Sequence, residues 1–313
     1  MRLDEGGLSV VQVVGFSYAR LAAGQRCPGK GEEMASEVAV LVIHGMGNQP
    51  ADFAAATEAR LRQEVERSGA DSARLCFQSV HWAPVIARGE DELWTRLELG
   101  QLRWGDLRRF VVHTLGDAIA YRRTEQGAPR EIYAEIHRLI HKSLQELRHS
   151  LRDADGPLVV IAHSLGSHMM SNFIWDAQHD LGYPEGPAFE DWSDFERMRT
   201  LTSFITFGCN IPLFTLAYLQ KGDVTAIQFP PDSLDPSLKS VAKWLNFYDS
   251  DDVLGYPLKH LSDSYQDAVT EDIKINAGGL FGFWNPLSHT GYWSDADFIR
   301  PVAHVLVDVL KAA

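Results

Sequence analysis

The sequence predicts an α/β fold in which a mostly parallel central sheet carries helices on both faces. Three observations predict it: short apolar runs rich in β-branched residues, helical spacing of apolar residues between them, and no linker or repeat that would divide the chain. Continuous apolar runs are typical of strands buried on both faces, and strands that alternate with helices indicate a parallel sheet. A chain of 313 residues is long enough for a sizeable core.

Six short runs are predicted to be strands. The clearest is the first, Val-Ala-Val-Leu-Val-Ile, which has no polar alternation at all. The fourth opens the longest uncharged stretch, 201–220, which Gly208, Asn210 and Pro212 interrupt, so we expect a buried strand and a loop there rather than a membrane span. The six predicted strands are 38–43, 74–80, 158–161, 202–207, 244–248 and 272–276.

Helices are predicted between these strands. Residues 52–67 place apolar side chains near one face, and 90–150 are mostly helical, with a three-to-four apolar spacing in their last part. We interpret about 90–150 as a helical insertion before the strand at 158–161. A closing helix covers 296–310, where Pro301 falls in the first turns and is tolerated.

The chain therefore divides into residues 1–36 and one domain, 37–313. The first segment has a short apolar run and a Gly-rich stretch without a repeating period, and Met34 precedes the first strand. We expect 1–36 to be a poorly ordered N-terminal extension, or the product of an overlong choice of start site.

Composition excludes several classes of function. The net charge of −13 argues against a nucleic-acid-binding protein, which needs a basic surface, and offers no general attraction to anionic lipid. Three scattered cysteines cannot form a disulfide framework, and they lack the spacing of a zinc site, so we expect thiols. With no signal-peptide pattern, the protein is expected to be soluble and cytoplasmic. The oligomeric state is not predicted.

The strongest chemical signal is Ala-His-Ser-Leu-Gly at 162–166, between a predicted buried strand and a helix. A nucleophilic serine needs a tight turn of this kind, with small residues two before and two after it. Ala162 stands where the usual pattern has glycine, and its methyl group is small enough for the turn to survive. Ser164 is the candidate nucleophile; the alternative is an ordinary serine in a turn.

A second signal, His-Gly-Met-Gly at 44–47, ends the first strand. Glycines let the backbone turn there and expose N–H groups, and a tetrahedral oxyanion needs two such donors. We assign these donors to the backbone N–H groups of Met46 and Leu165. A plain β-turn is the alternative interpretation of 44–47.

The third signal is the order of the residues that follow. A serine hydrolase of this architecture needs an acid after a later strand and then a histidine near the C-terminus. Asp-Ser-Asp-Asp at 249–252 follows the strand 244–248, and His289 follows the last strand. The order is therefore Ser164, Asp252, His289.

With these motifs the sequence resembles the α/β-hydrolase superfamily, in particular its lipase- and esterase-like branches, from about Val38 to the C-terminus. The resemblance implies an eight-stranded, mostly parallel sheet and a Ser-His-Asp triad. By position, Ser164 is then the nucleophile, His289 the general base and acid, and Asp252 the residue that orients His289. Asp252 is preferred to Asp249 and Asp251 because Asp252-Val253 resembles the pattern after the acid strand of that family. Stretches at 81–84, 116–117 and 121 are similar to those of uncharacterised bacterial members.

Other candidate sites are weaker. His137 and His141 have the spacing of two zinc ligands on a helix, but the glutamate of the zinc motif and a third ligand are missing, so we expect a solvated helix face and no metal. His163 and His168 flank the serine and are expected to pack or to support the site. No cofactor is expected.

The sequence thus predicts a serine hydrolase that cleaves a small-molecule carboxylic ester through an acyl-enzyme. The alternatives are an amidase, thioesterase or acyltransferase with the same triad, or a catalytically silent binding protein on the same fold. The tryptophan-rich stretch 94–104 is expected either to form a cap that receives an apolar acyl group or to pack on the sheet.

Overall fold

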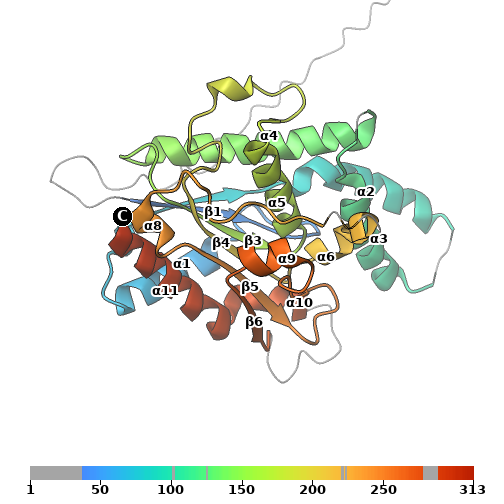
Figure 1. The fold of residues 1–313 in the computed structure, drawn as a ribbon. Helices are drawn as coiled ribbons and strands as arrows, with labels where there is room; N and C mark the ends of the chain where they lie inside the picture. The colour runs from blue at the N-terminus through green and yellow to red at the C-terminus, as the bar shows by residue number, and fades with distance from the viewer. Residues whose placement is uncertain (1–36, 101–102, 125, 220–221, 223, 278–287) are drawn as a thin grey trace, which may run out of the picture.

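The computed structural model describes residues 37–100, 103–124, 126–219, 222, 224–277 and 288–313. The predicted N-terminal extension, 1–36, lies outside the described residues. The remainder builds a parallel sheet between two layers of helices (Figure 1).

The sheet has six strands in the order β2-β1-β3-β4-β5-β6, and every neighbouring pair is parallel. All six predicted strands are confirmed, with ends that differ by at most two residues. The resemblance implied eight strands, whereas the described part of the chain has six. The strands are β1 (Val38–Ile43), β2 (Leu75–Val80), β3 (Leu158–His163), β4 (Leu201–Phe207), β5 (Lys243–Asp249) and β6 (Glu271–Ile275).

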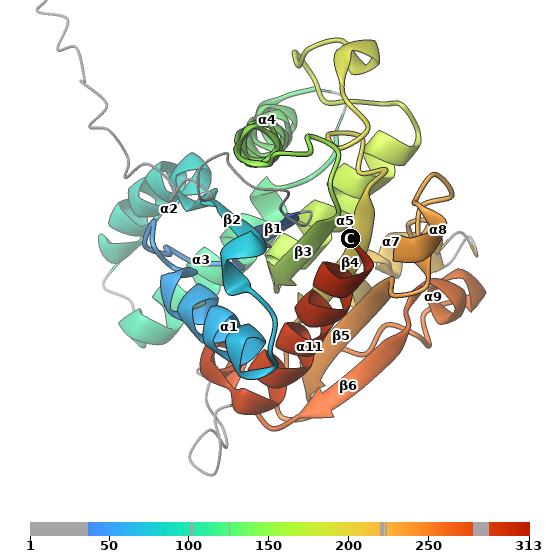
Figure 2. The same ribbon diagram turned by 90° about the vertical axis from the view of Figure 1, so that its left-hand side faces the viewer.

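Helices cover both faces of the sheet, as the fold class predicts. On one face α1 (Ala55–Arg67) packs against α11 (Ala296–Ala312), and on the other lie α4 (Ala128–Ser150) and α5 (Leu165–Gln178) (Figure 2). The side chains of β1 divide between two cores: Ala39, Leu41 and Ile43 face α4 and α5, and the alternating valines face α1 and α11. Burial on both faces explains the unbroken apolar run.

The predicted helical insertion contains three helices: α2 (Ala83–Glu98), α3 (Gly105–Ala120) and α4. The helix α4 crosses β2 and β1, while α2 and α3 pack against each other and against α4. Trp94 is buried, whereas Trp104 is 75% exposed, so the two tryptophans do not share one role.

Short helices complete the chain, most of them at the ends of strands. The stretch after β4 was predicted to be a loop and instead begins with two helical turns, α6 and α7. No helix among the described residues is long and apolar enough to cross a membrane. The short helices are η1 (Ser72–Arg74), η2 (Phe189–Asp191), α6 (Ile211–Phe214), α7 (Leu216–Leu219), α8 (Pro236–Lys239), α9 (Asp263–Ala268), α10 (Ser288–Gly291) and η4 (Tyr292–Ser294).

Two predictions about side chains are wrong. His137 and His141 are buried rather than solvated, because α4 turns that face toward the sheet and α5; His137 accepts or donates a hydrogen bond with Tyr121, and His141 with Glu196. Each imidazole thus has a polar partner in the core, although Nδ1 of His137 is buried without a hydrogen bond.

Among the described residues, Cys209 is a buried free thiol, as the sequence predicts.

Candidate active site

The candidate residues come together at the edge of the sheet where its strands end. Ser164 follows β3, the turn 44–47 follows β1, and Asp252 follows β5. Because parallel strands present their carboxyl ends at one edge, segments far apart in sequence meet there. His289, in α10 just before the closing helix, reaches the same edge.

Ser164 sits on the sharp turn between β3 and α5. Its backbone has φ 51° and ψ −124°, a conformation that non-glycine residues rarely adopt. The turn lies very close to the end of β1. A Cβ atom on Gly166 would lie 2.4 Å from the carbonyl oxygen of His44, and one on Gly45 would lie 2.5 Å from the Cβ of Ser164. Both glycines are therefore required by close backbone approach.

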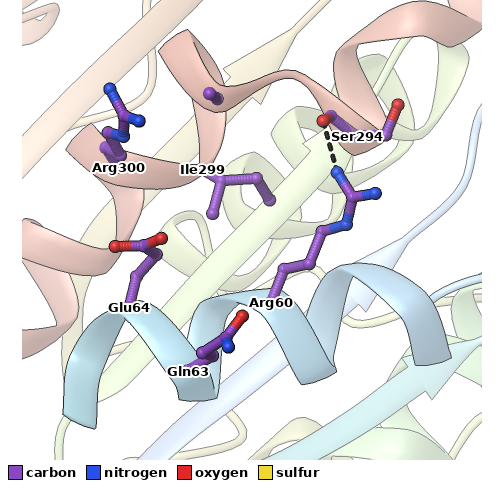
Figure 3. Close-up of a pocket in the computed structure, with 7 residues that line it drawn as sticks. Arg60, Gln63, Glu64, Ser294, Ile299 and Arg300 are labelled. Carbon is purple, nitrogen blue, oxygen red and sulfur yellow. Dashed lines mark hydrogen bonds between the residues drawn. The ribbon is translucent and has the colours of Figure 1, made fainter. Parts of the chain in front are cut away.

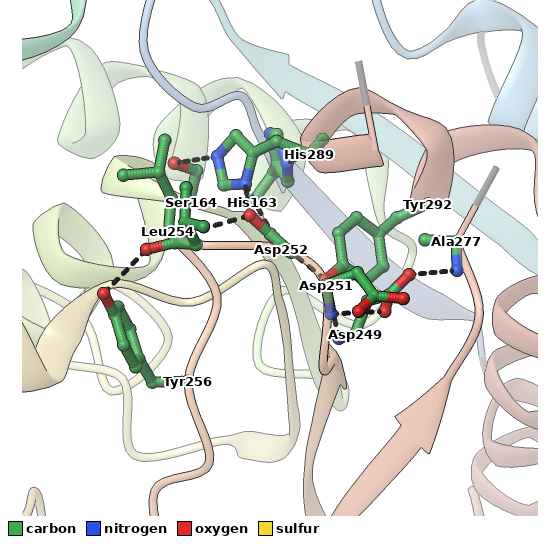
Figure 4. Close-up of polar contacts among 11 residues, drawn as sticks. His163, Ser164, Asp249, Asp251, Asp252, Leu254, Tyr256, Ala277, His289 and Tyr292 are labelled. Carbon is green, nitrogen blue, oxygen red and sulfur yellow. Dashed lines mark hydrogen bonds and ion pairs between the residues drawn. The ribbon is translucent and has the colours of Figure 1, made fainter. Parts of the chain in front are cut away.

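The side chains of Ser164, His289 and Asp252 form a continuous chain of hydrogen bonds (Figure 4). The Nε2 atom of His289 is 2.7 Å from the Oγ of Ser164. The Nδ1 atom of His289 is 2.8 Å from Oδ2 and 3.0 Å from Oδ1 of Asp252. Because a carboxylate only accepts, Nδ1 carries the proton, and Nε2 is left to accept the hydroxyl proton of Ser164.

The Asp252 carboxylate is buried but has several donors. Besides His289, it accepts hydrogen bonds from the Leu254 N–H at 3.0 Å and the Tyr292 hydroxyl at 2.9 Å. Burial by itself raises the pKa of Asp252, but the His289 contact and these two donors outweigh it and hold the pKa below its usual value. Asp252 is therefore ionised beside His289.

The two neighbouring aspartates have other positions. Asp249 is buried at the end of β5, where its side chain accepts hydrogen bonds from the N–H groups of Asp251 and Ala277 at 2.9 and 2.7 Å. It thereby ties the end of β5 to the end of β6. Asp251 is exposed. Of the three aspartates, Asp252 is the one that contacts His289.

Two residues position the ends of this chain of hydrogen bonds. The Nε2 atom of His163 donates to the backbone carbonyl of His289 at 2.7 Å. Burial lowers the pKa of His163 well below its ordinary value, so the ring is neutral. The Tyr292 hydroxyl accepts from the Asp249 N–H at 2.8 Å while donating to Asp252, and so links β5 to the acid.

The turn 44–47 is held by side chains on both sides. Trp82 N–H points at Nε2 of His44 at 3.2 Å, so Nδ1 carries the proton and donates to the Gly45 carbonyl at 2.7 Å. Burial lowers the pKa of His44 to about 3, so this neutral tautomer persists. On the other side, Gly47 N–H donates to Asp117 Oδ2 at 2.8 Å.

These contacts bear on the predicted oxyanion donors. The Gly47 N–H already donates a hydrogen bond to Asp117. We therefore keep the Met46 N–H as the predicted oxyanion donor of this turn. Leu165 is the first residue of α5, and the first N–H groups of a helix have no partner within it. The helix dipole adds partial positive charge at that position. The assignment of Met46 and Leu165 remains a prediction.

Two surface pockets in the described part of the chain contain none of the candidate residues. No group of three or more His, Cys, Asp or Glu side chains there is arranged to hold a metal ion. A surface pocket between α1 and the start of α11, drawn in Figure 3, contains none of the candidate residues. It is lined by Arg60, Gln63, Glu64, Ser294, Ala296, Ile299 and Arg300.

No protein-family model matches the chain, and no curated protein is significantly similar to it in sequence.

Sequence reasoning missed several supporting residues. Tyr292 and Asp117 form hydrogen bonds that join segments 40 and 70 residues apart in the chain. Glu90, which contacts Asp117, carried no signal at all. Such contacts depend on how helices pack, which short motifs do not encode.

Proposed function

We propose that this protein is a serine hydrolase that cleaves carboxylic esters through an acyl-enzyme on Ser164. One observation carries the proposal: a serine on a strained strand-to-helix turn is hydrogen-bonded to a histidine that a buried, ionised aspartate orients. A binding protein has no need of this combination. Acyl transfer of this kind requires a nucleophile, a base hydrogen-bonded to it, and an acid that orients the base.

The reaction follows from the proton positions. Nε2 of His289 takes the Ser164 hydroxyl proton as Oγ attacks the ester carbonyl, and Asp252 stabilises the imidazolium that forms. The N–H groups of Met46 and Leu165 donate hydrogen bonds to the oxyanion. His289 then gives its proton to the leaving alcohol, and the C–O bond breaks to leave an acyl-Ser164. A water activated by His289 releases the carboxylic acid and restores the serine.

A panel of p-nitrophenyl esters of increasing acyl length tests this proposal. We expect turnover by the wild type and a loss of about 10³-fold or more in kcat for Ser164→Ala or His289→Ala. The double variant should be little worse than either, because the members of a triad act as a unit. Ester turnover that survives in Ser164→Ala would contradict the proposal. Cleavage of amides or thioesters in place of esters would keep the triad and change the substrate class.

The same panel examines the acyl pocket. If the 94–104 region lines it, kcat/KM should rise with acyl length by up to about 0.8 kcal/mol per buried CH₂ group. Trp104→Ala should then lower kcat/KM for long-chain esters more than for acetyl esters. Because the Trp104 side chain is exposed, its removal leaves the core intact. A flat or falling profile would exclude lipid-like esters and favour a small polar substrate.

A further inference from the structure

Tyr292 lies beside the candidate triad and makes two hydrogen bonds through one hydroxyl group. Its side chain is buried, and its oxygen is 2.9 Å from Oδ2 of Asp252 and 2.8 Å from the backbone nitrogen of Asp249 (Figure 4). The ring lies against the turn after β4, where a Cβ atom on Gly208 would be 3.2 Å from Tyr292 Cε2 and 3.1 Å from His289 Cε1. The phenol and the imidazole thus flank the same residue next to the acid.

The direction of the hydroxyl proton is fixed by these partners. The Asp249 N–H can only donate, so the Tyr292 oxygen accepts from it. The single proton of the hydroxyl is then left for the Asp252 carboxylate, which only accepts. Burial and the negative charge of Asp252 both raise the pKa of Tyr292, so the hydroxyl keeps this proton throughout the pH range of an ester assay.

Tyr292 and His289 share one oxygen of Asp252. Oδ2 accepts from the hydroxyl at 2.9 Å and lies 2.8 Å from Nδ1 of His289. A hydrogen bond from a neutral donor offsets part of the negative charge of a carboxylate, and that charge is what stabilises an imidazolium. The Tyr292 donor therefore weakens the attraction of Asp252 for a protonated His289.

The other titratable groups nearby do not supply this effect. Among the described residues, those that act on the His289–Asp252 pair or on Tyr292 are His163 and Asp249. The ring of His163 is 4.8 Å from that of His289 between centroids, and burial keeps it neutral. His44, which acts on His163, is neutral as well. The Asp249 carboxylate is held by two backbone N–H groups.

We propose that Tyr292 is a positioning residue that sets the basicity of His289 by donating a hydrogen bond to Asp252. The inference rests on the proposed function, because it assigns the pH range in which that reaction runs. A general base must be unprotonated, so activity falls on the acidic side as the His289 ring takes up a proton. Without the Tyr292 donor the imidazolium is stabilised more, and this fall begins at a higher pH.

The test compares the pH dependence of kcat/KM in the wild type, Tyr292→Phe and a matched control, Tyr256→Phe. Phenylalanine keeps the ring and removes the hydroxyl. Tyr256 lies in the loop that carries Asp252, and its hydroxyl donates to the Val253 carbonyl at 2.7 Å (Figure 4). The control thus also loses one hydrogen bond, but none to the acid. The substrate is the p-nitrophenyl ester that the wild type turns over best.

We expect the acidic limb of the Tyr292→Phe profile to lie about 0.5–1 pH unit above that of the wild type, because a hydrogen bond to a charged group has a free energy of this order. Tyr256→Phe should follow the wild-type limb. A merely structural role would lower stability or the plateau without moving the limb. A Tyr292→Phe limb that coincides with the wild type, or lies at lower pH, would therefore overturn the inference.

A second variant keeps the test valid if Tyr292→Phe does not fold. Tyr292→3-fluorotyrosine retains the shape of the side chain and both hydrogen bonds, and fluorine makes the phenol a stronger donor. Its acidic limb should move the other way, to a lower pH than that of the wild type. An unchanged limb in this variant would also refute the role of Tyr292.

Direct titration of the His289 ring separates this inference from the proposed function. NMR of protein with isotope-labelled histidine follows the ring, whose signal is identified by its loss in His289→Ala. The ring should take up its proton at a higher pH in Tyr292→Phe than in the wild type. Ester turnover with no shift in either measurement refutes the role of Tyr292 alone. A shift of the ring without ester turnover supports the effect of Tyr292 on His289 and refutes the proposed function.

Discussion

At the scale of single residues, the candidate site is defined by which hydrogen bonds each side chain can make. Asp252 is the clearest case, because four acidic or hydroxyl residues stand in a row at 249–252. The Asp249 carboxylate accepts hydrogen bonds from the backbone N–H groups of Asp251 and Ala277. The Asp252 carboxylate accepts hydrogen bonds from His289 and Tyr292. Sequence order alone could narrow the acid to this run. The resemblance of Asp252-Val253 favoured Asp252, and in the structure Asp252 is the one of the three aspartates that contacts His289.

Replacing Asp252 tests this assignment. We expect Asp252→Asn to lower kcat by about 10³-fold or more, because the amide no longer fixes the tautomer of His289 or stabilises its imidazolium. The change should be visible in steady-state kinetics with a p-nitrophenyl ester. Asp251→Asn is the matched control and should retain wild-type kcat, since Asp251 is exposed. Equal losses in the two variants would show that the orienting acid is misassigned.

At the scale of elements, the sequence predicted what regular patterns encode. Short apolar runs located all six strands, and the signal was clearest for β1 and β3, which are apolar because both of their faces are covered. The edge strands β2 and β6 are partly exposed and carry polar residues. The two short helices after β4 were missed, since one or two turns contain too few residues to show a period. The face of α4 that carries His137 and His141 was assigned to solvent because histidine is polar. In the structure this face is buried, and the two imidazoles have hydrogen bonds with Tyr121 and Glu196.

The contact between the serine turn and the end of β1 gives a prediction at this scale. Gly166→Ala should lower the free energy of unfolding by about 1–3 kcal/mol, because its Cβ would meet the His44 carbonyl oxygen, and should reduce kcat as the turn shifts. Chemical denaturation and ester kinetics measure the two effects.

A second glycine serves as the control. Gly89 lies inside α2, and a Cβ there meets no atom within 4 Å. Gly89→Ala should be neutral or should stabilise the protein by up to about 1 kcal/mol, since alanine is the better helix former. If Gly166→Ala were as harmless as Gly89→Ala, the close approach of α5 to β1 would not be a requirement of the site.

At the scale of the whole molecule, the parallel topology assembles the candidate site. Ser164 and His289 are 125 residues apart in the chain, yet the atoms that would exchange a proton are 2.7 Å apart. The chain order of nucleophile, acid and histidine could be predicted from the sequence. So could the edge of the sheet at which they meet, because the carboxyl ends of parallel strands lie at one edge. The support that Asp117 of α3 gives the turn 44–47 could not, since this hydrogen bond joins residues 70 apart in the chain and depends on helix packing.

The central claim is that Ser164 is an activated nucleophile, and covalent labelling tests it most directly. A small fluorophosphonate reacts with serines that a neighbouring base activates, and peptide mass spectrometry locates the adduct. The account predicts one adduct per chain, on Ser164, and none after Ser164→Ala. It also predicts very slow labelling of His289→Ala, which keeps the serine but lacks the base. An adduct on another residue, or no adduct on folded wild-type protein, would contradict it.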